Sequence, residues 1–323
     1  MKKNIFFITI TITLLLNGVP ASAYKGLYCA KCGGNMPLNI FGAGIPATHE
    51  FHFKLSPIYL KMEGLRDGQS SVNGDSLLGI PAAGKFMAVP TDMDMQMLNF
   101  AAGHTFTDDF FAGLMVMYKK NEMGMKFNSI MAGPTVADQP DFTMKSNGLG
   151  DVMLATKYRL YTDEPFFPKK QVSLFLGLGI PTGSIDQKNS THPLAMRQGE
   201  QLPYSMQLGS GTFDPMAGIM YNASSSPYWW GANIIYTGRF YDNKRDYRLG
   251  DEVRYDLYGM YQIRYDLVAQ FQLNGRYWGK ISGEMDEARD GASGRSIKGD
   301  AASTYMTPLW DTGSYGGHKI LAT

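Results

Sequence analysis

The sequence has no excess of charge of either sign and no long apolar run in its interior. Lys and Arg number 30 against 29 for Asp and Glu, so net charge gives no reason to expect a nucleic acid as partner. After Leu16 no uncharged apolar stretch reaches the about 20 residues of a transmembrane helix. Any membrane crossing must therefore use strands closed into a barrel, because only helices and closed barrels satisfy every backbone polar group in lipid.

Charged residues are scarce as well, at 18% of the chain. An ordinary soluble domain has about 25%. Glycine (37 residues) and aromatic residues (13%) are plentiful instead. This balance is typical of a protein with an apolar outer surface.

Catalytic motifs are absent too. Neither Gly148-Leu-Gly150 nor Gly177-Leu-Gly179 continues to the third glycine of a dinucleotide site. The sequence contains no G-x-S-x-G elbow, and its five histidines show no H-E-x-x-H spacing. We therefore expect no enzyme, and an outer-membrane barrel enzyme is the alternative from a different class.

The N-terminus has the form of a secretory signal. Two lysines precede an apolar run from Ile5 to Leu16, and Ala21-Ser22-Ala23 offers the small-residue site of a signal peptidase. An uncleaved anchor is the alternative, but the run is shorter than the about 20 residues that span a bilayer. We expect three parts: a signal peptide at residues 1–23, a periplasmic segment at 24–48 and an outer-membrane β-barrel at 49–323.

Period-2 alternation, the mark of a strand with two different faces, recurs along the rest of the chain. From Tyr265 to Trp278 one face is mostly aromatic and aliphatic, and the other carries Asp, Gln, Asn and Arg. The segment from Val253 to Arg264 repeats the pattern, which predicts a tight hairpin. Two further strands are plausible beyond the visible candidates, which are residues 49–61, 92–105, 109–119, 124–132, 148–161, 170–181, 206–222, 227–241, 244–263 and 265–279.

The length of these segments favours a transmembrane barrel over a soluble β-sandwich. A membrane-crossing strand needs about 9 to 11 residues, whereas strands of soluble proteins average about 5 to 6. A short turn at 107–109 contrasts with long polar loops at 64–90, 186–203 and 279–304, as in outer-membrane barrels. We predict an all-β fold, a transmembrane antiparallel β-barrel of about 12 strands in the bacterial outer membrane.

Four phrases of the sequence resemble a known family. They are Gly148-Leu-Gly-Asp-Val152, Gly177-Leu-Gly-Ile-Pro-Thr-Gly-Ser-Ile-Asp186, Leu202-Pro-Tyr-Ser-Met-Gln-Leu-Gly-Ser-Gly-Thr-Phe-Asp214 and Tyr247-Arg-Leu-Gly-Asp251. Together they look like the outer-membrane proteins of the MetA pathway of phenol degradation, which are often labelled transporters. The resemblance covers residues 92–280. It implies an outer-membrane barrel that takes up aromatic or other apolar compounds, and it supplies no catalytic residues.

The C-terminus departs from the usual pattern of such barrels, whose last strand ends in an aromatic residue. This chain ends Gly316-Gly-His-Lys-Ile-Leu-Ala-Thr323. We expect this sequence to lack one or two closing strands at its C-terminus, because an open barrel would expose sheet edges to lipid.

Cys29 and Cys32 follow shortly after the expected cleavage point, in a compartment that oxidises thiols. A local disulfide between them is the first interpretation. A metal site of Cys29, Cys32, His49 and His52 is the second, although the histidine spacing fits zinc only loosely. His49 and His52 would also point to opposite faces of a strand. Attachment of c-type haem is excluded because Gly33, not histidine, follows Cys32.

Methionine is unusually frequent, with 21 residues in the chain, 11 of them between Met87 and Met153. If Leu98, Phe100 and Leu114 face lipid, parity places five methionines in the lumen: Met93, Met95, Met97, Met115 and Met117. They fill a narrow lumen, form an adaptable wall for apolar solutes, or bind copper or silver through their soft thioethers. We expect no cofactor, with copper as the one alternative.

The same parity defines the charge of the polar face. Six cations, Lys157, Arg159, Arg239, Arg254, Arg264 and Arg276, face three anions, Asp151, Asp256 and Asp266. A basic lining favours anions or carboxylated solutes. We predict a channel or transporter for small, apolar or aromatic solutes, with a methionine-rich copper-binding or copper-export barrel as the alternative. The expected partners are outer-membrane lipid, lipopolysaccharide, the barrel-insertion machinery and the solute, and not nucleic acid.

Overall fold

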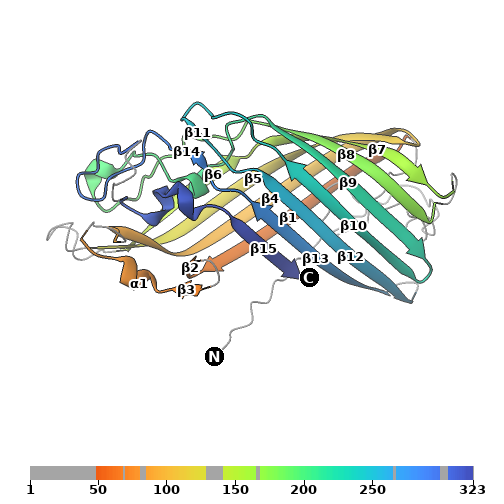
Figure 1. Ribbon diagram of the computed structural model, residues 1–323, viewed down its shortest axis with the longest axis horizontal. Helices are drawn as coiled ribbons and strands as arrows, with labels where there is room; N and C mark the ends of the chain where they lie inside the picture. Colours follow the sequence, from red (N-terminus) through yellow and green to blue (C-terminus); the bar gives the residue numbers. More distant parts are fainter. Residues whose placement is uncertain are drawn as a thin grey trace.

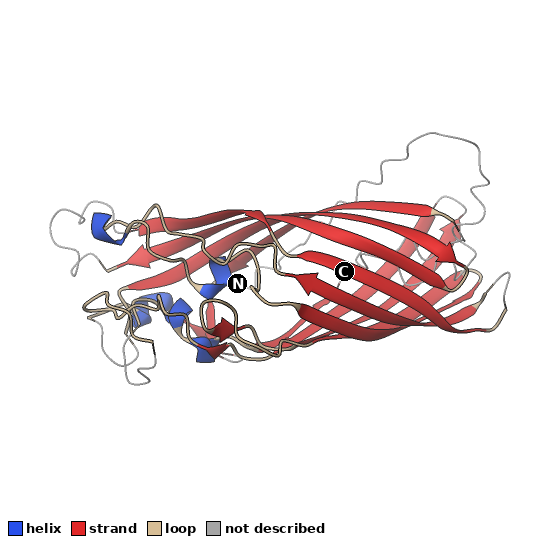
Figure 2. Cartoon of the chain, turned by 90° about the horizontal axis from the view of Figure 1, so that it is seen from above, coloured by secondary structure: helices blue, strands red, loops and turns tan. Residues whose placement is uncertain are grey.

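The computed structural model describes residues 49–67, 70–80, 85–128, 141–164, 168–264, 267–298 and 305–322. Its main element is an antiparallel sheet of eleven strands that curls into a long barrel-shaped wall (Figure 1, Figure 2). The predicted all-β, barrel-type fold is confirmed. The expected signal peptide at 1–23 and the segment 24–48 lie outside the described residues.

The strands follow one another around the wall almost in chain order. That order is β1 (Phe51–Glu63), β4 (Ala88–Thr107), β5 (Phe110–Phe127), β7 (Val152–Thr162), β8 (Lys170–Ile180), β9 (Asp214–Ser225), β10 (Tyr228–Thr237), β12 (Glu252–Arg264), β13 (Leu267–Trp278) and β15 (Gly317–Ala322). β6 (Asp141–Leu149) also pairs with β5. It pairs with residues 118–126 of β5, whereas β7 pairs with residues 110–115 of the same strand. β1 and β15 are the two end strands of this order.

The structure corrects several strand boundaries. The predicted segment 109–119 and the beginning of 124–132, up to Phe127, belong to one strand, β5, because Lys120 and Glu122 interrupt the apolar pattern but not the pairing. The predicted strands 206–222 and 244–263 begin only at Asp214 and Glu252, and the residues before them are loops. β6 was not predicted, because polar residues lie on both its faces and hide the alternation. The end strand β15 was not predicted either.

The two ends of the wall differ. Short connections join β4 to β5, β9 to β10 and β12 to β13 at one end, and the predicted turn at 107–109 is among them. Long loops leave the other end, where the short helices gather with β11 and β14 (Figure 1). These loops carry β2 (Leu65–Asp67), β3 (Ser70–Val72), α1 (Gly74–Leu77), η3 (Ala195–Arg197), η4 (Tyr204–Met206), β11 (Tyr247–Arg248), β14 (Ser282–Gly283), η5 (Pro308–Trp310) and η6 (Thr312–Ser314). In the described part of the chain, no helix is long and apolar enough to cross a membrane.

In most of the sheet, large apolar side chains point outward and polar ones point inward. We call this part of the sheet the wall. Outward-facing examples are Leu114, Leu154, Ile234, Leu257 and Phe271, all exposed. Inward-facing examples are Asn99, Lys157, Gln171, Asn233 and Gln272, all buried. This arrangement is the reverse of a soluble protein and is the alternation of a strand whose outer face contacts lipid.

The pattern inverts where β4, β5 and β6 run past the rest of the sheet. On the outer face of β5, Leu114 and Tyr118 give way to Lys120 and Glu122, which form an ion pair of 3.3 Å. On the inner face the same strand carries buried Asn121 and then apolar side chains from Met123 to Phe127. We call this part the extension: residues 88–96 of β4, 120–127 of β5 and 141–147 of β6. Its outer face suits water rather than lipid.

The long loops fold over the inner face of the extension and form a cover, comprising residues 181–213, 238–251 and 279–316 in so far as they are described. Leu202, Met206 and Met306 of the cover pack against Met93, Met125 and other buried side chains of the extension. The cover also has a core of its own around Tyr204, Tyr247 and Trp310. The cover is therefore a packed structure that lies against the inner face of the extension.

Candidate solute path

The methionines predicted to face the lumen do lie on the inner face, but in two different surroundings. Met93 and Met95 belong to the extension, where they pack in the core with Phe127 and Phe142. Met115 and Met117, which are nearer to the short-turn end of β5, pack together with Met153 and Met216 of neighbouring strands. Met97 lies between these groups, opposite Lys119 in register. Packing thus accounts for Met93, whereas Met97 and Met117 are only half-buried.

The fold brings further methionines together that the sequence pattern did not single out. Six of them join Met93 and Met95 where the cover contacts the extension: Met87, Met123, Met125, Met144, Met206 and Met306. Flexible thioethers fill irregular seams well. Binding of copper by any of them stays a prediction.

Two of the predicted cations form a pair at the loop end of the wall. Arg254 and Arg276 are direct cross-strand partners on β12 and β13. Both bind the same carboxylate: Arg276 Nη2 lies 2.6 Å from Glu252 Oε2, and Arg254 Nε donates to Glu252 Oε1. Glu252 is buried, with 1% of its side chain exposed, while about half of each arginine side chain (50% and 54%) remains exposed. We call Arg254 and Arg276 the arginine pair.

Aromatic stacking and further cations surround the arginine pair. The guanidinium of Arg276 lies 5.0 Å from the ring centroid of Trp278, a cation–π contact. Lys319 of β15 is the next residue in the same cross-strand row. Lys119 of β5 is near enough for the charges of both arginines to act on it, and its Nζ donates to Leu208 O at 3.0 Å. The mouth of the wall is therefore lined by cations beneath the cover.

Lys157 and Arg159, also predicted for the lumen, are enclosed at the short-turn end. Lys157 is fully buried and lies 5.8 Å from the ring centroid of Phe111. Arg159 is buried and pairs with Asp109 at 3.3 Å. Both side chains face inward, but they are packed into the wall rather than lining open space.

Arg239 and Arg264 occupy other places than the lumen. Arg239 follows β10 and binds buried Asp214 at 2.9 Å, while its backbone N–H donates to Asp251 at 2.8 Å. It therefore fastens a loop to the rim. Arg264 is the last residue of β12 and is exposed at the short-turn end. Of the predicted anions, Asp256 faces inward and Asp266 lies outside the described residues.

The structure describes only His49 and His52 of the predicted metal set, which therefore stays a prediction. His49 sits in a turn with φ of 62°, and its ring lies 6.2 Å from that of His104. His52 lies on β1 instead, where it is half-buried and 3.5 Å from Glu50. No group of three potential His, Cys, Asp or Glu ligands occurs in the part of the chain that the structure describes. Cys29 and Cys32 lie outside that part, so the disulfide stays a prediction.

Three of the family-like phrases meet at the rim, where the cover enters the wall. Asp151, between β6 and β7, accepts hydrogen bonds from Gly183 N at 2.9 Å and Ser210 N at 2.8 Å. Gly183 and Gly209 approach so closely that a Cβ on Gly209 would lie 2.5 Å from the carbonyl oxygen of Gly183. Asn243 donates to Ser210 O at 2.9 Å and links the next loop. These phrases therefore hold the loops to the wall.

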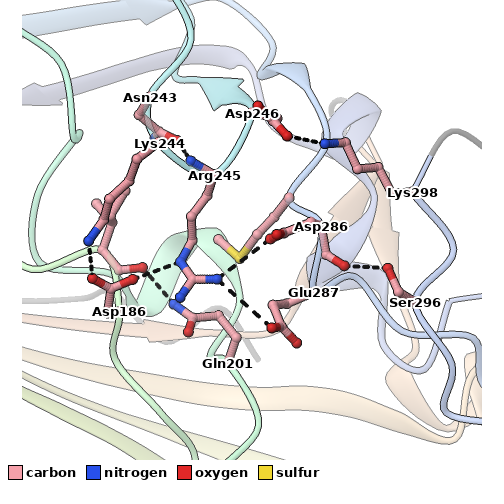
Figure 3. Close-up of polar contacts among 12 residues, drawn as sticks. Asp186, Gln201, Asn243, Lys244, Arg245, Asp246, Asp286, Glu287, Ser296 and Lys298 are labelled. Carbon is pink, nitrogen blue, oxygen red and sulfur yellow. Dashed lines mark hydrogen bonds and ion pairs between the residues drawn. The ribbon is translucent and has the colours of Figure 1, made fainter.

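Ion pairs join the loops of the cover to one another (Figure 3). Arg245 contacts Asp186 at 2.7 Å and Asp286 at 3.5 Å, which links three separate loops. Hydrogen bonds from Lys244 and Arg245 lower the pKa of Asp186 and keep it ionised. Lys298 and Asp246 form another ion pair between two of these loops.

A buried histidine sits at the contact between cover and extension. His192 packs between Phe127 and Phe142, with ring centroids 5.5 and 5.0 Å away. Its Nδ1 accepts a hydrogen bond from Leu194 N at 3.1 Å. Burial, with a smaller contribution from the charge of Arg197, lowers the pKa of His192 to about 4. His192 is therefore neutral at pH 7.

The sequence reasoning missed two residues of the mouth, Glu252 and Lys119. Parity alone would have found both, because Glu252 is two residues before Arg254 and Lys119 two residues after Met117. That Glu252 bridges two strands could not have been read from spacing, since it depends on the register of β12 with β13.

The chain is similar to known proteins over most of its length. The family model described as "Putative MetA-pathway of phenol degradation" matches residues 91–309. Among solved structures, the chain is similar to an outer membrane channel from Pseudomonas putida F1, with 12% identity and a TM-score of 0.43. That match covers 74% of this chain and 76% of the other. No curated protein matches the sequence.

Proposed function

The chain belongs to the family of the MetA pathway of phenol degradation, and we propose that it is an outer-membrane channel that admits small apolar or aromatic solutes. The proposed role is transport rather than catalysis. The family description concerns the breakdown of phenol, an aromatic compound, and such a pathway needs a route for aromatic molecules through the outer membrane.

The observation that carries the proposal is the inverted wall. Its outer face presents Leu114, Leu154 and Phe271, while Asn233 and Gln272 face inward. A wall of this kind is stable only with lipid outside, because exposed apolar area of this extent costs free energy in water. We infer that the short-turn end faces the periplasm and that the cover faces outward, since outer-membrane barrels have short periplasmic turns and long external loops.

The inner surface at the mouth suits an amphipathic solute. Met97 and Met117 offer adaptable apolar contacts beside Lys119, and the arginine pair adds charge. The cover stands in front of this surface, so passage requires the loops to move or a gap between them to widen.

Conductance and uptake test this proposal together. The purified protein should form discrete conductance steps in planar bilayers, and a strain lacking it should take up benzoate or phenol more slowly than the parent. The protein should also run as a heat-modifiable band from outer-membrane fractions. Recovery in the soluble periplasmic fraction, or bilayers without conductance steps, would contradict the proposal.

A further inference from the structure

Three cations stand side by side in one cross-strand row at the mouth. Arg254 pairs with Arg276, and Arg276 pairs with Lys319. Like charges directly opposite one another destabilise a sheet. Lys119 adds a fourth cation from the neighbouring part of the lumen. Three carboxylates stand against these four cations: Glu252 and Asp256 on the inner face of β12, and Asp151, whose charge acts on Lys119, so positive charge remains in excess.

Glu252 does more than reduce this charge. Its two oxygens each bind one arginine, so the buried carboxylate fixes both guanidinium groups from one side. The guanidinium of Arg276 also contacts the ring of Trp278, whose centroid lies 5.0 Å away. Each guanidinium has five N–H donors, and the exposed half of each arginine keeps donors free to bind a further partner.

We infer that the arginine pair is a binding site for the carboxylate group of small organic acids, with Glu252 as the positioning residue of this site. Planar guanidinium donors match a carboxylate in two-point contact, which a single lysine charge does not. The apolar body of the acid would contact Met97 and Met117, the neighbours of Lys119 on the facing wall. The inference rests on the proposed function, of which it names the preferred solute class.

The substitution Glu252→Gln distinguishes a preorganised carboxylate site from a lumen that attracts anions only by its positive charge. It removes a negative charge, so a general electrostatic field would bind anions more tightly and raise chloride selectivity. A preorganised site predicts weaker binding of carboxylates instead, because the two guanidinium groups lose the carboxylate that orients them both. We expect benzoate to bind the Glu252→Gln protein about tenfold more weakly, the size of effect that follows from losing oriented charge-assisted hydrogen bonds.

Further variants test the chemistry of the two arginines. Arg276→Lys and Arg254→Lys keep the charge but remove the planar donor edge, and each should weaken benzoate binding while leaving chloride conductance close to that of the parent. Arg264→Gln, which removes an exposed cation at the opposite end of β12, is the matched control and should change neither. Benzyl alcohol, with the same ring and no carboxylate, should bind all variants alike.

Binding is measured by calorimetry on the full-length protein in detergent, and selectivity by reversal potentials in bilayers, with heat modifiability as the check on folding. Equal or tighter benzoate binding by Glu252→Gln, or equal loss in Arg264→Gln, would overturn the inference. If the parent protein conducts but does not distinguish benzoate from benzyl alcohol, the inferred carboxylate site is ruled out, while the proposed channel function is supported. If it binds benzoate but never conducts, the proposed function fails instead.

Discussion

The wall and the extension are parts of one sheet and have opposite surfaces. On β1 the outer face changes from Phe53 and Leu55 to Lys61 and Glu63. On β6 it is polar up to Asn147, and β7 then continues with Leu154. Tyr118, whose hydroxyl accepts a hydrogen bond from Asn147 at 3.2 Å, lies at the change.

In the proposed outer-membrane setting, this difference lets a single β-strand serve two solvents. The wall needs apolar residues outside because lipid offers no hydrogen bonds, and it tolerates Asn, Gln and Arg inside. The extension stands in water, so it needs an apolar inside like any soluble sheet and obtains it from the methionines and the cover. The edge of the lipid-facing band therefore runs obliquely across the strands at Tyr59, Leu98, Tyr118 and Leu149.

Matched charge insertions should break this comparison with the largest effect. Leu154→Arg puts a cation on the outer face of the wall, and Gln96→Arg puts one on the outer face of the extension. The first should destabilise the protein by about 2 to 4 kcal/mol, as for a cation near the bilayer midplane. The second should stay within about 0.5 kcal/mol. Urea unfolding in lipid vesicles measures both, and similar losses would place the lipid boundary wrongly.

Acid should loosen the extension and spare the wall. Because the pKa of His192 is about 4 in the folded protein and about 6.5 when unfolded, neutral His192 stabilises the contact fully above pH 6.5. This stabilisation is lost as the pH falls from 6.5 towards 4, by at most about 3 kcal/mol.

Hydrogen exchange of residues 190–206 at pH 7 and pH 4.5 measures this effect, with amides of β8 and β9 as the internal reference. His192→Phe should remove most of the pH dependence, because phenylalanine does not titrate. Faster exchange of the reference strands to the same degree would show that acid acts on the wall instead.

The smallest effect is expected from the ion pairs of the cover. Arg245→Ala removes contacts with Asp186 and Asp286, which are partly exposed, so it should cost no more than about 1 kcal/mol. We expect faster protease cleavage within the cover and an unchanged heat-modifiable band. Addition of 1 M salt should produce a similar change in the parent protein, since salt screens exposed pairs. A parent that is insensitive to salt would assign the cover's stability to its apolar core alone.

The sequence by itself determined the wall. Alternation in β10, β12 and β13 predicted which side chains face outward, because the side-chain period of a strand is two wherever the strand lies. Trp229, which lies between the exposed residues Tyr228 and Trp230, points inward and is buried, as that same parity requires. The inward direction of Met93, Met97 and Met115 followed from the same rule.

Only the tertiary structure decided what the inward-facing residues do. Parity gives a direction but not the distance to the far wall or the presence of a loop. Met93 and Met97 therefore look alike in sequence, although one is packed under the cover and the other is half-buried beside Lys119. The sharing of Glu252 by Arg254 and Arg276 likewise depends on strand register, which is set by pairing between segments and not by the spacing within either.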